Sequence, residues 1–188
     1  MEIFILIENN KYIFLAVISI ILATLEYFKS IKTNRTFSFR YFQDLFFWFL
    51  IIDNIILPSS EDKIEPILTT FFEQANISYL RELFNIRDFN LYLQFFIVFI
   101  TFELINYLFH RFIKHNRFTW QLHKVHHSSK HLNQFSDARN HPLFIFIEGL
   151  LINLPIMSIL SPTWEPLVIY GVIRTFWGPL IHMNCDIK

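Results

Sequence analysis

Long apolar runs separated by charged stretches dominate the hydropathy pattern of this chain. One run extends from about Tyr12 to Phe28 and another from about Phe89 to Phe109. Both approach the ~20 residues that a helix needs to cross a ~30 Å hydrocarbon core. A further run, from about Tyr41 to Leu57, contains Asp44 and Asp53, which must face a protein interior or the membrane interface. The pattern therefore predicts three membrane-spanning helices, the middle one being the weaker candidate.

The last third of the chain follows a different pattern. A polar stretch from Arg111 to Asn140 precedes two apolar segments, at about Leu143–Leu160 and Leu167–Ile181. Both segments are short for a full crossing, and prolines at positions 155, 162 and 166 interrupt them. We expect a bent or partly re-entrant helical hairpin here. The predicted fold is all-α, an integral membrane helical bundle, with spans and loops in residues 1–88 and a second region in residues 89–188.

Composition agrees with this expectation. Hydrophobic residues make up 53% of the chain, and only three glycines accompany 24 phenylalanines, which suits packed helices better than a turn-rich β-fold. The formal net charge is zero, so we expect no nucleic-acid partner. The single cysteine, Cys185, excludes an intrachain disulfide and a cysteine-ligated zinc site.

The distribution of lysine and arginine predicts the orientation of the spans. The stretch after the first run is basic, with Lys29, Lys32, Arg35 and Arg40. Six acids outnumber three basic residues after the second run, and basic residues dominate again after the third. Because cytoplasmic loops are enriched in basic residues, this alternation places the polar stretch from Arg111 to Asn140 in the cytoplasm.

All eight histidines lie in the second half of the chain, at His110, His115, His123, His126, His127, His131, His141 and His182. His123, His126 and His127 form the pattern His-x-x-His-His. On an ideal helix these three positions share an arc of about 100°. Three imidazoles on one face are typical of a metal site, whereas the alternative is a basic loop that is merely rich in histidine.

Residues before this cluster add polar groups to the same region. His110 and His115 are five residues apart, about 140° around an ideal helix, so they share a site only if the helix ends or bulges between them. Glu103 and Tyr107 lie on the helix face of His110, with Asn106. Glu103 is either a partner that orients a metal ligand from another helix or an interhelical hydrogen-bonding group.

The remaining histidines differ in their context. His141 precedes Pro142, where it is either a metal ligand or a helix-capping residue. His182 ends the last apolar segment, and we expect it to be a ligand. His131 is predicted to be a solvated loop residue, and Cys185 to have no role in the site.

At these residues the chain resembles the sterol desaturase/fatty acid hydroxylase superfamily of membrane di-iron proteins. One matching motif is Glu103-Leu-Ile-Asn-Tyr107-Leu-Phe-His110-Arg111, followed by His115; the family more often has aspartate at the first position. The next is Trp120-Gln-Leu-His123-Lys-Val-His126-His127-Ser128-Ser129, then Asn133 and Arg139-Asn140-His141-Pro142. His182-Met183-Asn184 is similar to the family's His-x-Asn element. In the family a further His-x-x-His-His box follows the His-x-Asn element. This box is absent from the region of residues 89–188, so we expect a fragment of a longer protein or a truncated product.

The resemblance implies two iron ions, with zinc possible in isolated protein, bound by His110, His115, His123, His126, His127, His141 and His182. Glu103, Tyr107, Trp120 and Asn184 would support catalysis. The implied reaction hydroxylates or desaturates a lipid with O2 and electrons. Because no haem-attachment or dinucleotide motif is present, the electron donor would be a separate protein. The alternatives are a catalytically incomplete membrane metal-binding relative and a bis-histidine haem protein.

Overall fold

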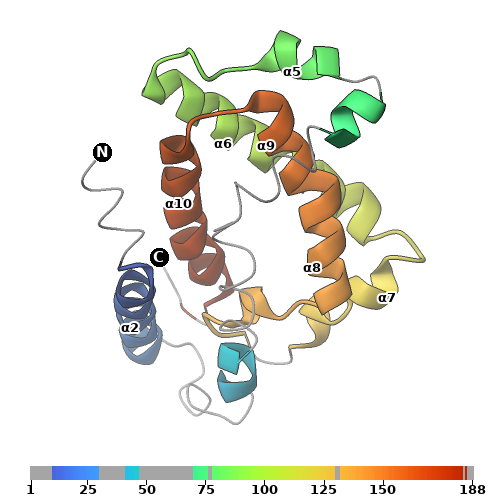
Figure 1. Cartoon of the computed structure of the whole chain (residues 1–188). Coiled ribbons are helices and arrows are strands. Elements are labelled where there is room, and N and C mark those ends of the chain that lie inside the picture. Colours follow the sequence, from blue (N-terminus) through green and yellow to red (C-terminus); the bar gives the residue numbers. More distant parts are fainter. Residues whose placement is uncertain are drawn as a thin grey trace. The chain divides into compact units, whose positions relative to one another are not determined.

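The computed structural model describes residues 10–29, 41–46, 70–75, 78–129, 132–183 and 185. Within these ranges the chain forms helices joined by turns, and no strand is among them (Figure 1). The chain divides into two compact units. One consists of residues 1–52, 124–140 and 171–188, and the other of residues 53–123 and 141–170. The all-helical part of the predicted fold class is therefore confirmed.

Helix α2 (Lys11–Lys29) lies at the first predicted span and belongs to the first unit. Leu15, Leu22 and Glu26 are buried, and their spacing of seven and four residues puts them on one helix face. Residues 41–46 are also helical. The rest of the second predicted span, up to Leu57, and most of the basic stretch before it lie outside the described residues.

The second unit contains two long helical runs. Helix α6 (Leu91–Leu108) begins at Asn90, whose side chain accepts a hydrogen bond from the Leu93 amide at 3.0 Å, which is a standard N-cap. It continues into the π-helix η1 (Phe109–Lys114). The other run consists of α8 (Pro142–Glu148), the π-helix η4 (Gly149–Asn153) and α9 (Leu154–Leu160).

The core of the second unit lies between these two runs. Val98, Phe102 and Phe109, all on one side of the first run, pack with Phe144 and Ile152 of the second. The adjoining α5 (Ser78–Phe84) is tied to the end of α9 by a 2.9 Å hydrogen bond from Arg81 to the Ser161 hydroxyl. Ser161 itself adopts a left-handed conformation (φ 43°), which ends α9.

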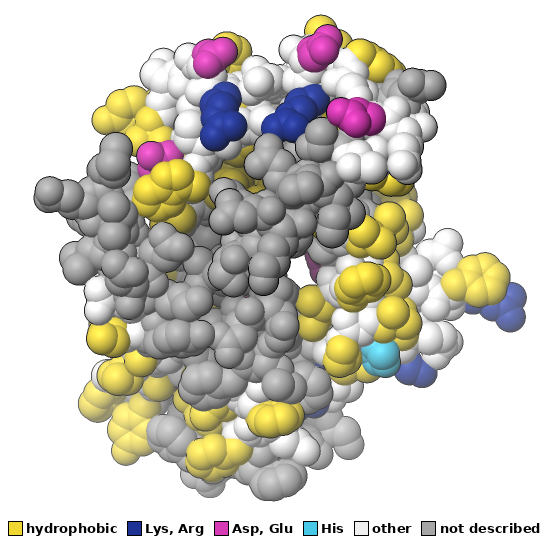
Figure 2. All heavy atoms as spheres, viewed as in Figure 1, with side chains coloured by type: hydrophobic (Ala, Val, Ile, Leu, Met, Phe, Trp, Pro, Cys, Tyr) yellow, Lys and Arg dark blue, Asp and Glu magenta, His cyan; other side chains and the backbone are white. Residues whose placement is uncertain are grey.

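Two helices within the described residues are long and apolar enough to cross a membrane, namely Leu91–Lys114 and Pro142–Leu160. Only 17% and 22% of their apolar windows are buried within the protein. Figure 2 shows hydrophobic side chains spread over the visible surface. The length and apolar composition of the two helices are those of membrane-spanning helices, and to that extent they suggest a membrane protein.

The segment after Pro142 was expected to be short for a full crossing, but its helical run, Pro142–Leu160, is long enough by length and composition. Pro155 falls in the first turn of α9, directly after η4, and does not interrupt the helical run, which has 19 residues in total. Pro142 occupies the first turn of α8, where its missing N–H costs nothing. The last apolar segment is also helical, forming α10 (Trp164–His182) with Pro179 inside it.

Candidate metal centre

The π-helix η1 places His110 and His115 on the same side of the chain. Hydrogen bonds in a π-helix join residues five apart, which is the separation of these two histidines. Their ring centroids lie 5.2 Å apart at an interplanar angle of 60°. Of the two irregularities that would let these histidines share a site, a helix end or a bulge, the structure shows the bulge, at the end of the apolar run that begins at Leu91.

His123 joins this pair from the short helix α7 (Trp120–His123). Its ring centroid lies 4.9 Å from that of His110 and 5.6 Å from that of His115. The side chain is buried and faces the Phe144 ring at 5.8 Å. Trp120 stacks on His115 with centroids 5.4 Å apart and planes 27° apart, so aromatic contacts restrict the rotation of two of the three imidazoles.

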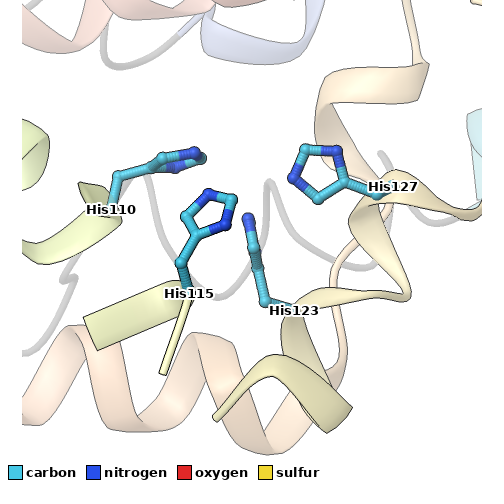
Figure 3. A group of neighbouring side chains, drawn as sticks. All are labelled: His110, His115, His123 and His127. Atoms are coloured by element: carbon cyan, nitrogen blue, oxygen red, sulfur yellow. The ribbon is translucent and has the colours of Figure 1, made fainter. Parts of the chain in front are cut away.

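His127 completes a group of four imidazoles. The ligand nitrogens of His110, His115, His123 and His127 all lie within 4.8 Å of one another, and Figure 3 shows the four rings facing one another. Ligands on opposite sides of an ion at ~2.1 Å are ~4.2 Å apart, so small ring rotations would suffice to close this group on a metal. An all-imidazole donor set suits iron, zinc and copper. The residues present therefore fit a metal ion.

The predicted helical face of His-x-x-His-His is wrong. Helix α7 ends at His123, and the 3-10 helix η2 (His126–Ser128) begins three residues later. Because a 3-10 helix is wound more tightly than an α-helix, the three imidazoles do not follow the α-helical arc. His126 stands outside the group of four, with its ring centroid 5.2 Å from His127 and 5.3 Å from His182.

His182 and His141 occupy helix ends. His182 lies in the last turn of α10, beside His126. His141 is the N-cap of α8, and its Nδ1 accepts a hydrogen bond from the Leu143 amide at 3.2 Å. This contact is the capping role, which occupies the Nδ1 lone pair. Metal binding by His141 stays a prediction.

The residues expected to support catalysis are placed differently from one another. Glu103 accepts a hydrogen bond from the Tyr170 hydroxyl at 3.0 Å, which is the interhelical contact considered from the sequence. Tyr107 is exposed, and its hydroxyl accepts from Arg111 at 2.9 Å. Trp120 contacts the histidine rings directly. Asn184 and His131 lie outside the described residues.

Sequence reasoning missed a buried polar network in the first unit. The fully buried Asp44 carboxylate accepts hydrogen bonds from Asn133 at 2.8 Å and from Ser136 at 3.3 Å. It also forms an ion pair with Arg139. The only signal was an acid within an apolar run, which predicted that Asp44 faces a protein interior but not which residues it meets.

A second ion pair, in the other unit, was equally hard to predict from the sequence. Lys114, at the end of η1, lies 3.0 Å from the Glu148 carboxylate at the end of α8.

Cys185 shows no sign of activation. Burial, and secondarily the charge of Glu26, raise the pKa of its thiol, so it stays protonated at neutral pH.

Comparison with known proteins adds one finding. The family model described as fatty acid hydroxylase matches residues 95–188, half of the chain. This range holds the whole group of four imidazoles as well as His126, His141 and His182. No curated protein and no solved structure is detectably similar to the chain.

Proposed function

The chain belongs to the fatty acid hydroxylase family, and on this premise we propose that it is a membrane-bound di-iron oxidoreductase that hydroxylates or desaturates a lipid with O2. The observation that supports this most directly is the group of four imidazoles with nitrogens within 4.8 Å. It lies within the matched range and includes the end of an apolar helix long enough to cross a membrane. The hydrocarbon chain of a lipid substrate can reach such a position without leaving the membrane.

His110, His115, His123 and His127 are the residues that would hold the first ion. His126 and His182 are the proposed ligands of the second, with His141 as a further candidate. Iron, when bound, supplies the redox chemistry with O2 that no side chain of the protein provides. Trp120 holds the His115 ring by stacking, and Phe144 lies against the buried His123 ring, so both imidazoles are restricted in their orientation.

The remaining parts of the proposal concern partners and orientation. The basic stretch around the histidines supports a cytoplasmic location. Electrons would then come from a separate cytoplasmic protein, and the substrate from the bilayer. Tyr107 and Asn184 are proposed to shape the site, and Glu103 to act as the partner of a metal ligand from another helix. Residues 1–88 would supply spans that anchor the histidine-bearing region, residues 89–188.

Iron analysis of the purified chain tests this function. We expect bound iron in the wild-type protein, loss of it in His123→Ala, and retention of it in His131→Ala, whose histidine is predicted to be solvated. Turnover is measured as O2 consumption with reductant and lipid. Unchanged iron content in His123→Ala contradicts the site.

Two further outcomes identify the alternatives. Iron without O2 consumption indicates a catalytically incomplete metal-binding relative. A Soret absorption band indicates a bis-histidine haem protein, and the di-iron proposal would then be abandoned.

A further inference from the structure

The imidazole of His182 is held at one of its two ring nitrogens. Its Nδ1 lies 2.8 Å from the backbone oxygen of Gly178, one helical turn earlier, and 3.4 Å from Oδ1 of Asp137. A carbonyl oxygen only accepts hydrogen bonds, and so does an ionised carboxylate. Nδ1 must therefore carry the proton, which leaves the lone pair of the neutral ring on Nε2.

Asp137 reaches this position from a firmly held turn. It lies in the 3-10 helix η3 (Ser136–Ala138), between two residues that bind the same buried carboxylate. Ser136 donates to Asp44 at 3.3 Å, and Arg139 forms an ion pair with it. The Asp137 side chain itself is 35% exposed. Its backbone is thus fixed while its carboxylate has room to move.

Gly178 provides the space for this carboxylate. A Cβ at position 178 would collide with Oδ2 of Asp137 and lie 3.0 Å from its Cγ. The backbone of Gly178 does not have a positive φ, so conformation does not require glycine here. The residue matters because a methyl group would displace the Asp137 carboxylate from its place beside His182.

We propose that Asp137 and Gly178 act together as positioning residues for His182. The backbone oxygen of Gly178 accepts a hydrogen bond from Nδ1–H, and the missing side chain of Gly178 leaves space for the Asp137 carboxylate, which lies beside the same N–H and stabilises the ring orientation. Nε2 is thereby kept as the ligand atom. This inference rests on the proposed metal-binding function, since its consequence is the affinity of His182, together with the neighbouring His126, for an ion.

Cobalt(II) affinity of the purified full chain tests the proposal by competition with a chelator. Loss of a group that orients a histidine ligand typically weakens metal binding by about 10–100-fold. For Asp137→Ala and for Gly178→Ala, we expect the affinity for the more weakly bound cobalt ion to fall by a factor of that order. The exposed Asp88 provides the matched control, and Asp88→Asn should bind cobalt like the wild type.

The double variant Asp137→Ala/Gly178→Ala separates positioning from packing. If Gly178 acts by leaving space for the carboxylate, the methyl group adds no further loss once that carboxylate is removed. In addition, Gly178→Ala should not lower the melting temperature of the metal-free protein, because alanine favours helices over glycine. Additive losses, or wild-type affinity in Asp137→Ala, would overturn the proposal. Asp137→Ser, which also removes the carboxylate, replaces Asp137→Ala if the latter does not fold.

A second measurement is independent of metal. In the metal-free protein with 15N-labelled histidine, we expect the His182 signal, assigned by its loss in His182→Gln, to show the proton on Nδ1. Asp137→Ala should increase the population with the proton on Nε2. If the wild type binds no cobalt but these tautomers are found, the proposed function fails and the positioning role stands. An unchanged tautomer in Asp137→Ala refutes the role.

Discussion

Asp44 is the most deeply buried of the acidic residues that the structure describes. Its carboxylate is fully buried and meets Arg139, Asn133 and Ser136. Replacing it by asparagine leaves the Arg139 cation without its counter-charge in a site where its side chain is only 13% exposed. Removing one partner of a buried pair typically costs ~3–5 kcal/mol. We expect Asp44→Asn to lower the free energy of unfolding by about this amount, measured by denaturant titration in detergent.

The partner residue allows a sharper version of this experiment. Replacing both members of a buried ion pair by apolar residues is often close to neutral. Asp44→Leu/Arg139→Met should therefore be more stable than Asp44→Asn. If Asp44→Asn unfolds like the exposed control Asp88→Asn, the network does not stabilise the fold as the contacts indicate.

Glu103 allows the structural and functional roles of one side chain to be separated. Glutamine keeps an oxygen that can accept the Tyr170 hydrogen bond but loses the charge. We expect Glu103→Gln to fold with normal stability and to impair iron binding or turnover. Tyr170→Phe removes the hydroxyl alone and should cost ~1 kcal/mol of stability with iron content unchanged. A loss of stability without loss of function in Glu103→Gln assigns Glu103 a structural role only.

At the scale of elements, the π-helix η1 contacts α8 through an ion pair. Lys114 lies 3.0 Å from Glu148, and its ammonium group is 5.3 Å from the centre of the Phe144 ring. Because His110 lies in η1 and His115 directly follows it, a change in the geometry of η1 would separate their imidazoles. We expect Glu148→Gln to cost ~1.5–3 kcal/mol of stability, the usual range for a hydrogen bond to a charged group, and to weaken cobalt binding.

A charge reversal tests whether the pair itself is responsible. The single variants Lys114→Glu and Glu148→Lys each lose the attraction, and the double variant Lys114→Glu/Glu148→Lys restores it. The double variant should therefore recover part of the stability that each single variant loses. If both single variants bind cobalt normally, η1 keeps its geometry without this contact.

Sequence periodicity predicted straight helices well and irregular ones poorly. Long apolar stretches located α2 and α6 to within two residues, because burial and helix propensity act along the whole segment. The turn after His123 was not foreseen, since the residues between the histidines are compatible with an α-helix and their packing decides. The five-residue spacing of His110 and His115 implied that the helix ends or bulges between them if both bind one site. Nothing comparable marked η4, where a widened turn accommodates Pro155.

At the scale of the whole molecule, the missing information was long-range pairing. Asp44 meets Arg139 across 95 positions, and Glu26 accepts from the Gln134 backbone across 108. Composition indicates that a buried acid needs partners, yet many basic or amide groups satisfy that need equally. The histidine group was accessible from sequence because its members are close along the chain and chemically specific. The packing that holds Asp137 beside His182 follows only from three-dimensional contacts.

Membrane orientation is the whole-molecule property that the charge pattern predicts most specifically. Lys124 lies between histidines of the proposed site, and Glu82 lies in the acidic stretch; both are exposed. In a Cys185→Ser background, we expect Lys124→Cys to react with a membrane-impermeant maleimide only from the cytoplasmic side of sealed vesicles. Glu82→Cys should react only from the opposite side, because Leu91–Lys114, which separates the two positions, is long enough to cross. Labelling of both from one side would show that this helix does not span the bilayer.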